Sequence, residues 1–475
     1  LKKLGLVSVI VVEHDELARG DERERAAVAE ETLRVVRALE RLGAAARPVL
    51  GAVVRLGPDP DADAAQDDDD ARAPAPEAHT RPCDLAPLRA ALRAGEIPVI
   101  SPLALDSFCR SVRVDANDVI GALAKGMVDA AGADADAARG AADEEGAATG
   151  AAAAAASDEV ELTPMRLMII NREGGVPSYA RHGLPHLLIN LESEYAYIRD
   201  TFQDAWRSTH RTALANLALA RTCLAHMPPT SSAVMVSHRS PSSLIGNLIT
   251  NKPAVSSSLP HALLQGNRRL TAATPTLLRR GLEVRVLRAP GAVDRAKLTA
   301  LLQASFGRAL DADAFYARLA RALDFVIVAG DYAGAAVVTR EPGGVTYLDK
   351  FAVHPRHQGD GTVDFLWVAL HDETCGLGLP FSANPNGGRG GRGDACDLVW
   401  RSRADNPVNG WYFERSSGHV RAGGWVLFWC DAERPLRLAE GRRGAAGLSF
   451  IEDWERGRLE RWQEAVMKIP SVWAT

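Results

Sequence analysis

The stretch of sequence that most constrains the fold runs from Tyr347 to Trp367. Its first part, up to Val353, has the apolar and aromatic residues of a strand, and Pro355 ends that run. Gly359 and Gly361 then allow left-handed backbone angles, which let successive N–H groups converge on one anion. The helical pattern that follows directs the positive end of a helix dipole to the same point. The stretch therefore predicts an anion cradle; the alternative is a plain connection between strand and helix.

Composition limits the class of protein. A chain of 475 residues is long enough for two or three domains. No apolar run approaches the roughly 18 residues that a membrane-spanning helix needs, and a net charge of -5 with scattered arginines lacks the basic stripe typical of nucleic-acid binding. We therefore expect neither a membrane span nor a nucleic-acid partner. The six cysteines form no C-x-x-C pair, so no metal site is predicted.

Apolar runs alternate with helical patterns in the first half of the chain. Leu4 to Val12 and Ile97 to Ile100 are continuous apolar runs typical of buried strands, whereas Ala26 to Leu42 has the spacing of an amphipathic helix. Such alternation predicts an α/β fold with a parallel, doubly wound sheet. Leu187 to Trp206 is predicted to be helical, and Leu244 to His261 mixes turn residues with serines.

Two low-complexity inserts interrupt this pattern, near residues 58–82 and 130–157. Both are rich in alanine and acidic residues and lack an apolar stripe that could pack against a core. Alanine favours a helix in the second insert, but with nothing to pack against we expect disorder in both.

The pattern changes near Pro275, which predicts a boundary between a first domain, residues 1–275, and a second, residues 276–475. The second domain mixes helical patterns with strands. Among them is a predicted hairpin whose turn holds Gly330 and Asp331. We therefore expect a mixed α+β arrangement in the second domain.

Several strings in the second domain resemble one family. They are Tyr347 to Val353 (YLDKFAV), Gln358 to Gly361 (QGDG), Trp400 to Arg403 (WRSR), Asn406 to Asn409 (NPVN) and Trp411 to Phe413 (WYF). Together they resemble the acetyltransferase domain of N-acetylglutamate synthase. Upstream strings, among them Asn171 to Ser178 (NREGGVPS), resemble the fungal form of that family, the mitochondrial amino-acid acetyltransferases of arginine biosynthesis. Apart from the two inserts, the resemblance covers nearly the whole chain.

The resemblance implies an amino-acid-kinase-like domain, incomplete at its N-terminus, followed by a GNAT acetyltransferase domain. It implies transfer of acetyl from acetyl-CoA to the α-amino group of L-glutamate, feedback inhibition by arginine, association with acetylglutamate kinase, a homo-oligomer and a location in the mitochondrial matrix. The first domain is expected to regulate and to carry out no phosphoryl transfer. Two other hypotheses stay open: a catalytically weak regulatory subunit that binds arginine and the kinase, and a GNAT enzyme with another acceptor amine.

The cradle is the predicted site for the pyrophosphate of acetyl-CoA. Backbone N–H groups and the helix dipole would stabilise that anion. The residues concerned are Gln358, Gly359, Asp360, Gly361 and Thr362. The resemblance adds main-chain groups of Ala352 and Val353, which would hold the pantetheine arm.

The predicted acceptor site is basic. The resemblance makes Lys350 a glutamate-binding residue, although pattern alone would favour an exposed lysine on an edge strand. Arg401 and Arg403 project to one side of a predicted strand, where their forked guanidiniums suit carboxylates. Ser402 on the opposite side and Asn406 just beyond would add polar contacts to this carboxylate clamp.

Tyr412 is the candidate acid that protonates the departing CoA thiolate, because a phenol can donate a proton near neutral pH without carrying charge. Core packing is the alternative for Tyr412 and the interpretation that we adopt for Trp411 and Phe413. No single base stands out; Asp349 and Glu414 are guesses, and proton removal through ordered water is the other possibility.

Overall fold

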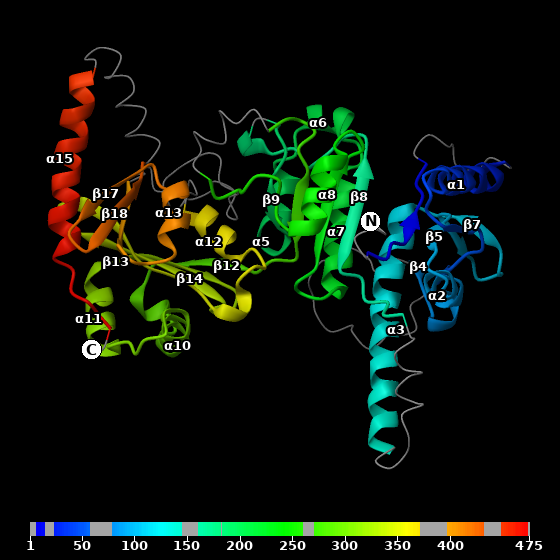
Figure 1. Cartoon of the computed structure of the whole chain (residues 1–475), viewed down its shortest axis with the longest axis horizontal. Coiled ribbons are helices and arrows are strands. Elements are labelled where there is room, and N and C mark those ends of the chain that lie inside the picture. Colours follow the sequence, from blue (N-terminus) through cyan, green and yellow to red (C-terminus); the bar gives the residue numbers. More distant parts are fainter. Residues whose placement is uncertain are drawn as a thin grey trace. The chain divides into compact units, whose positions relative to one another are not determined.

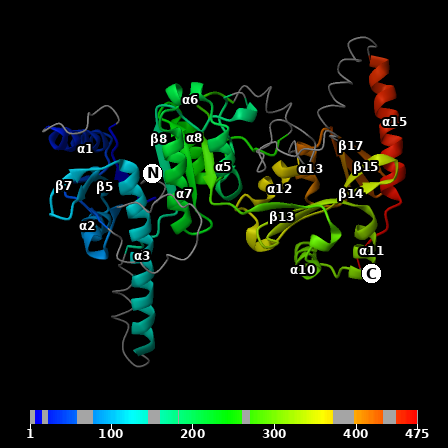
Figure 2. The ribbon, with the colours of Figure 1, turned by 180° about the vertical axis from the view of Figure 1, so that it is seen from behind.

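The computed structural model describes residues 6–14, 23–57, 78–144, 160–181, 183–259, 270–370, 397–431 and 448–473. The chain divides into two compact units, one of residues 1–167 with 215–231 and one of residues 168–214 with 232–475. Figures 1 and 2 show the elements from opposite sides. The predicted domain boundary at residue 275 falls inside the second unit and stays a prediction. In the described part of the chain, no helix is long and apolar enough to cross a bilayer.

The first unit is built on small sheets with helices packed against them. A parallel sheet has the order β1-β5-β2, with β1 at Ile10–Val11, β5 at Ile97–Ile100 and β2 at Ala46–Val49. A mixed sheet has the order β4-β3-β6-β7, at Ala78–His79, Val54–Leu56, Leu103–Leu105 and Ser111–Arg113. The helices are α1 (Glu24–Arg41), α2 (Ala86–Arg93), α3 (Ala116–Glu144) and α7 (Ala213–His226). The predicted α/β class is confirmed.

The second insert is partly helical. α3 continues through residues 130–144, so the expectation of disorder there is wrong. The physical reason is that helix nucleation is costly but propagation is not, and a helix already formed by residues 116–129 extends readily into alanine. Ala130 is 1% exposed and belongs to the core of this unit. Residues 145–157 and most of the first insert, residues 58–77, lie outside the described residues.

The second unit begins with a four-stranded sheet in the order β8-β10-β11-β9. Its strands are β8 (Arg166–Asn171), β10 (Ser232–Ser237), β11 (Thr276–Arg279) and β9 (Leu188–Asn190). Its helices are α5 (Leu191–Asp200), α6 (Asp204–Thr209) and α8 (Pro241–Thr250).

Two local predictions are wrong in this sheet region. The run from Leu187 starts as strand β9, and α5 begins only after Asn190, whose side chain caps that helix by accepting from Ser193 N at 3.4 Å. Asparagine favours such a cap because its side chain competes with the backbone for hydrogen bonds. Residues 244–250 belong to helix α8 and not to turns, and Pro241 opens that helix with a preset φ.

The rest of the second unit contains a seven-stranded sheet among the described residues. Its order is β12 (Val284–Leu287), β13 (Leu323–Ala329), β14 (Gly334–Glu341), β15 (Val345–Val353), β16 (Leu398–Arg403), β18 (Trp425–Cys430) and β17 (Gly418–Ala422). Neighbouring strands are antiparallel except β15 and β16, which are parallel. The predicted hairpin is confirmed as β13 and β14.

Helices cover both faces of this sheet. Figures 1 and 2 show α10 (Arg295–Phe306) and α11 (Ala312–Ala322) on one face, and α12 (Thr362–Leu370) and α13 (Asn409–Arg415) on the other. A further helix, α15 (Leu448–Met467), contacts β15 and β16. The largest buried side chains here are Trp367 of α12 and Trp400 of β16, whose rings meet edge to face at 5.4 Å.

Gly334 in β14 lets α12 pack close to the sheet. A Cβ built on this residue would lie 2.7 Å from Leu366 Cδ1, 3.1 Å from Thr362 Cγ2 and 3.2 Å from the carbonyl oxygen of Ala352. These distances are shorter than ordinary van der Waals contacts, so the first turn of α12 would have to move away from the sheet. Gly246 in α8 is the opposite case, because nothing lies within 4 Å of its Cβ position.

We expect Gly334→Ala to lower the free energy of unfolding by about 1–3 kcal/mol through overpacking. Gly246→Ala is the matched control and is expected to raise stability by about 0.5–1 kcal/mol, because alanine is favoured over glycine inside a helix. Chemical denaturation followed by tryptophan fluorescence measures both. A Gly334→Ala protein as stable as the wild type would contradict the close contact between α12 and β14.

Candidate active site

The predicted cradle lies between β15 and α12. Gly359 and Gly361 have φ angles of 97° and 98°, so the left-handed backbone expected at both glycines is confirmed. α12 starts at Thr362, directly after the turn, and the first N–H groups of a helix have no partner within it. A Cβ on Gly361 would also lie 3.2 Å from the Phe365 ring. The turn therefore needs glycine there both for its backbone angle and for space.

Asp360 caps the first turn of α12. Its Oδ1 accepts hydrogen bonds from Thr362 N at 3.0 Å and Thr362 Oγ1 at 2.6 Å, and its Oδ2 lies 3.0 Å from His357 Nδ1. The carboxylate satisfies one helix N–H and places a negative charge at the turn. The Asp360 side chain therefore does not attract an anion, whereas the backbone N–H groups of the turn and the helix dipole do. Gln358 and Gly359 are exposed.

β15 and β16 pair over two residues and then diverge. The paired residues are Thr346 with Leu398 and Tyr347 with Val399. Beyond them β15 continues along β14, whereas β16 continues along β18. Among the strands that the structure describes, the edge of β15 after Tyr347 has no partner on this side.

The direction of the backbone amides shows which of them face the open edge of β15. His354 N donates to Ala333 O at 2.8 Å, which places the His354 amide on the side of β14. Because main-chain groups alternate in direction along a strand, the Ala352 amide also faces β14. The amides of Phe351 and Val353 then face the open edge. Of the two residues predicted to hold a pantetheine arm, Val353 is the one whose amide points to that edge.

A β-bulge at Asp349 sets the direction of two charged side chains. β14 pairs Val337 with Lys350 and Val338 with Leu348, so Asp349 is the extra residue. As a result, Asp349 and Lys350 can meet although they are neighbours in a strand, and Lys350 Nζ lies 2.5 Å from Asp349 Oδ1.

Lys350 is buried, with 9% of its surface exposed, although it lies on the part of β15 that has left β16. Its ammonium lies 5.5 Å from the ring centre of Phe315 on α11 and 5.9 Å from that of Trp473. An exposed lysine on an edge strand, the alternative that pattern alone favoured, is therefore excluded. A buried ammonium needs a compensating charge, which Asp349 supplies.

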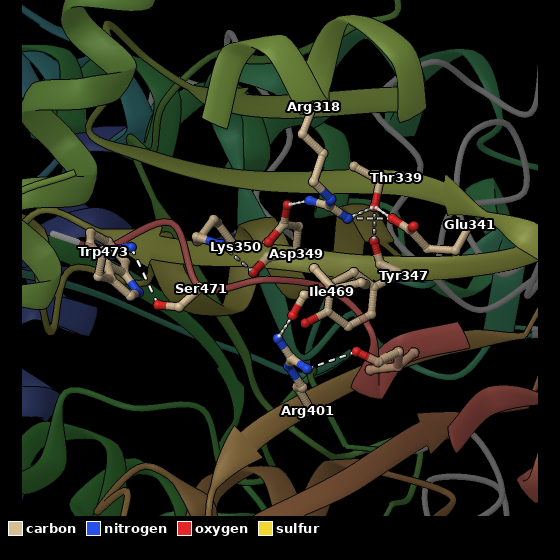
Figure 3. A network of polar contacts seen from close by, with 11 residues as sticks. Arg318, Thr339, Glu341, Tyr347, Asp349, Lys350, Arg401, Ile469, Ser471 and Trp473 are labelled. Atoms are coloured by element: carbon tan, nitrogen blue, oxygen red, sulfur yellow. Dashed lines mark hydrogen bonds and ion pairs between the residues drawn. The ribbon is translucent and has the colours of Figure 1, made fainter. Parts of the chain in front are cut away.

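Arg318 of α11 completes the charge network (Figure 3). Its guanidinium donates to Asp349 through Nη1 and to Glu341 through Nη2, and Thr339 Oγ1 donates to Glu341 Oε1 at 2.7 Å. Burial alone would raise the pKa of Asp349, but the Lys350 ammonium and the Arg318 guanidinium outweigh it and hold that pKa below its ordinary value. Asp349 is therefore ionised and engaged on both sides, which makes it a weak base.

Arg401 in β16 holds the end of α15. Its Nη1 donates to Val466 O at 2.8 Å and its Nη2 to Ile469 O at 2.5 Å, and its guanidinium lies 4.6 Å from the Trp425 ring centre. Cations are stabilised at the C-terminal end of a helix by its unpaired carbonyls. Within the described residues no carboxylate pairs with Arg401, so its positive charge is not neutralised there.

The other predicted clamp residues are separate from Arg401. Arg403 is exposed and lies 3.8 Å from Asp405 Oδ1. Ser402 is buried on the opposite side of β16, where its Oγ accepts from Asn406 Nδ2 at 2.9 Å. The structure thus joins Ser402 with Asn406 but does not bring Arg403 to the same partners as Arg401.

Tyr412 lies among aromatic rings on α13. Its ring centre is 5.4 Å from that of Trp400, 5.5 Å from Phe428 and 6.3 Å from Trp367. Burial raises the pKa of Tyr412 to about 12, so the phenol stays protonated at neutral pH. This state suits a proton donor, although the same rings also fit the core-packing alternative.

The candidate residues lie on two faces of the sheet. Trp400 packs toward α12 and α13, whereas the next residue, Arg401, reaches the end of α15. Lys350 and Arg401 contact the same segment, residues 466–473. Tyr412 is therefore on the face opposite the two cations.

A second polar network links both site helices to an earlier loop. Ser258 Oγ donates to Asp364 Oδ1 of α12 at 2.6 Å and accepts from Arg415 Nε of α13 at 2.8 Å. Ser256 Oγ lies 2.7 Å from Ser258 Oγ and accepts from Arg415 Nη2 at 3.3 Å. Arg415 is 7% exposed and stacks over Trp411 at 4.2 Å. One loop therefore anchors the helix after the cradle and the helix that carries Tyr412.

Sequence reasoning missed three arginines near the site: Arg279 and Arg415 are 3% and 7% exposed, and the Arg318 side chain is 12% exposed. Arg279 ends strand β11 and donates to Gly359 O of the cradle at 3.4 Å and to Asn251 O at 2.9 Å; Arg318 and Arg415 belong to the networks above. Each follows or sits among apolar residues at a buried spacing, as Arg318 does three residues after Phe315. An arginine at such a position signals a buried partner. In the described part of the chain, no group of three or more His, Cys, Asp or Glu residues is placed to hold a metal.

A family of acetyltransferase domains matches the second half of the chain. Residues 284–377 and 392–440 match the NAT family, described as the N-acetyltransferase of N-acetylglutamate synthase. A solved N-acetylglutamate synthase from Neisseria gonorrhoeae, complexed with coenzyme A and N-acetyl-glutamate, is 14% identical with a TM-score of 0.42, over 89% of this chain and 83% of that chain. At that score the likeness supports no inference about this chain.

Curated relatives match the whole chain. The mitochondrial amino-acid acetyltransferase of Laccaria bicolor is 65% identical over 478 residues, which cover 100% of this chain and 81% of that protein. The protein of the same name from Coprinopsis cinerea is 63% identical, covering 100% of this chain and 75% of its own length. Identity of this extent over the full chain establishes common family membership, and the chain belongs to the family of mitochondrial amino-acid acetyltransferases.

Proposed function

We propose that this enzyme transfers the acetyl group of acetyl-CoA to the α-amino group of L-glutamate, giving N-acetyl-L-glutamate as the first step of arginine biosynthesis. One observation carries the choice of acceptor. Lys350 and Arg401 are two cations that contact one segment on the same face, and no carboxylate in the described residues neutralises Arg401. One acceptor carboxylate would neutralise Arg401, and the second would bind the Lys350 ammonium, whose partner Asp349 is shared with Arg318.

Acetyl-CoA is the proposed donor, with its pyrophosphate at the turn from Gln358 to Thr362. The support is the pair of left-handed glycines followed directly by the start of α12. The pantetheine arm would lie along the open edge of β15, where the Val353 amide has no strand partner among the described residues, with Ala352 beside it. This path leads the thioester from the cradle toward the divergence of β15 and β16.

The chemistry that we propose is direct transfer. The neutral α-amine of glutamate attacks the thioester carbonyl carbon, and a C–N bond forms as the carbonyl becomes a tetrahedral oxyanion. The intermediate collapses, the C–S bond breaks, and Tyr412 donates its phenolic proton to the departing thiolate. The nitrogen loses one proton to water as the intermediate collapses, because Asp349 is engaged by two cations, and the Tyr412 phenolate regains a proton from water.

Lys350 and Arg401 are the proposed carboxylate-binding groups, with Arg403, Ser402 and Asn406 at the edge of the acceptor site. Arg401 has five N–H donors, of which two bond to carbonyls of the C-terminal segment. The others could reach a carboxylate without loss of the helix contact. Ser402 and Asn406 would shape the turn after β16 on the opposite face.

The resemblance also supports proposals about regulation. We propose feedback inhibition by arginine through residues 1–275, association with acetylglutamate kinase, a homo-oligomer and a location in the mitochondrial matrix. The loop that holds Ser256 and Ser258 offers a physical route for regulation, since it bonds to both α12 and α13.

Acceptor choice tests the proposed function. We expect kcat/KM for L-glutamate to exceed that for L-glutamine by about 10- to 100-fold, because glutamine loses one charge-assisted contact of the kind worth about 1.5–3 kcal/mol. Release of CoA thiol is the measurement, with the KM for acetyl-CoA as the control for donor binding. Equal use of glutamine, or preference for a monocarboxylic amine, would overturn the two-carboxylate site, and absence of any turnover by folded protein would favour the regulatory-subunit hypothesis.

Tyr412→Phe tests the proton donor. We expect kcat to fall about 10²-fold, the lower end of general acid catalysis, with little change in the KM for glutamate. Because the raised pKa of Tyr412, about 12, keeps the phenol protonated up to alkaline pH, the loss should be the same from pH 6 to pH 9.

Tyr316→Phe is the matched control for that experiment. The Tyr316 hydroxyl donates to Arg295 O at 2.7 Å, between α10 and α11 and away from the proposed chemistry. Its loss should leave kcat unchanged. If Tyr412→Phe retains wild-type kcat, core packing is the whole role of that residue.

A further inference from the structure

The ammonium of Lys350 is held in one place. The bulge turns it to the side of Asp349, where it bonds to the carboxylate at 2.5 Å and to the Asp349 carbonyl oxygen at 3.3 Å. The rings of Phe315 and Trp473 flank it. An ammonium has three N–H donors, so one donor remains without an acceptor in the part of the chain that the structure describes.

Without Arg318, the negative charge of Asp349 would weaken the attraction between the Lys350 ammonium and a substrate carboxylate. A carboxylate in contact with the ammonium neutralises it, and a second carboxylate arriving from a substrate would meet that negative charge. Arg318 changes this balance, because it donates to the other oxygen of Asp349 (Figure 3). The Asp349 charge is then shared between two cations, and Lys350 keeps part of its own.

Glu341 takes up part of the Arg318 charge, so Arg318 offsets the Asp349 charge only in part. Arg318 also donates to Glu341, which accepts from Thr339 Oγ1. The four side chains Arg318, Lys350, Asp349 and Glu341 are thus balanced, with two charges of each sign. All four are at most 12% exposed at the side chain, so water screens them little. A change in one charge should be felt strongly at the ammonium.

We propose that Asp349 and Arg318 are positioning residues for acetyl transfer: Asp349 holds the Lys350 ammonium toward the acceptor's carboxylate, and Arg318 offsets the Asp349 charge so that the ammonium still attracts it. The proposal rests on the proposed function, because it takes the acceptor to be a dicarboxylic amino acid. It differs from that function in assigning roles to two residues that do not themselves contact substrate.

A double-mutant cycle tests whether Asp349 acts through Lys350. Asp349→Asn, Lys350→Met and the double variant are compared with wild type in the thiol-release assay. We expect each single change to lower kcat/KM for glutamate at least about tenfold, with the KM for acetyl-CoA unchanged within about twofold. In the Lys350→Met background, Asp349→Asn should add less than about twofold, because residues that act as one unit are not additive.

The matched control is Asp324→Asn. Asp324 is a carboxylate of the same sheet, 6% exposed at its side chain and 3.3 Å from Arg340 Nη2, and it is not part of the Lys350 network. Its removal is expected to alter thermal unfolding without changing the kinetics toward glutamate. Fully additive losses in the Asp349 and Lys350 cycle, or an equal loss in Asp324→Asn, would overturn the positioning role.

Variants of Arg318 provide a second test, which does not depend on whether the Asp349 variant folds. Arg318→Lys keeps the positive charge and is expected to retain more of the kcat/KM for glutamate than Arg318→Gln, which leaves two acids facing one ammonium. If the two variants have equal glutamate kinetics, the charge of Arg318 is not what matters, and the proposal fails. Turnover of glutamate by the wild type separates the proposed function from the positioning role. If the wild type does not turn over glutamate, both are overturned. If it does, but the losses in the mutants are additive, only the positioning role is overturned.

Discussion

The structure around the site depends on a short parallel contact. β15 and β16 share register at only two residue pairs, Thr346 with Leu398 and Tyr347 with Val399. Before that point the sheet is continuous; after it each strand keeps a different antiparallel neighbour. On the open edge of β15 the Val353 carbonyl oxygen accepts from Ser305 Oγ at 3.2 Å, whereas the amides of Phe351 and Val353 have no strand partner among the described residues, and buried backbone groups need partners. A ligand that lies extended along the edge can supply them, which explains why the cradle, the bulge and both basic side chains belong to these two strands or follow directly after them.

The charged side chains beside this contact are stabilised by ion pairs and not by water. Lys350 and Asp349 are both buried, and ion pairs in such places rarely add stability over apolar packing, because removal from water is costly. Their presence with Arg318 and Glu341 makes better sense as a fixed electrostatic surface for a charged acceptor than as a stabilising device. Arg401 differs, since its contacts are with neutral carbonyls at the end of α15, so it brings positive charge and also holds the helix.

The sequence pattern correctly predicted the features that depend on neighbouring residues alone. Glycines at 359 and 361 require the left-handed turn, and the run from Phe325 to Thr339 contains its own hairpin turn, so both could be predicted without knowledge of the rest of the chain. The helix over residues 130–144 was missed because its stability comes from residues 116–129, upstream of the insert. α8 begins at Pro241, whose preset φ opens the helix, and the serines that directly follow it favour turns, so the pattern did not predict a helix there.

The sequence indicates candidate site residues but not their arrangement. The strings around Lys350, Arg401 and Tyr412 name candidates, yet no spacing reveals that the first two face α11 and α15 while Tyr412 faces α12. The direction of Lys350 follows from the bulge at Asp349, which depends on a one-residue mismatch with β14 and leaves no mark in the sequence of β15. Arg318 lies 31 residues from its partner Asp349, beyond the reach of any local motif.

The loop with Ser256 and Ser258 has a consequence for how the chain can be cut. It precedes the residues that match the NAT family, which begin at residue 284, yet its hydroxyls bond to Asp364 and to the buried Arg415. A fragment that started at the predicted boundary would carry the whole seven-stranded sheet but would leave that guanidinium and that carboxylate without these serine hydroxyls. The strands of the acetyltransferase sheet all lie downstream of the predicted boundary, but some partners of its buried polar groups lie upstream. A fragment that keeps these hydrogen bonds therefore has to begin upstream of Ser256.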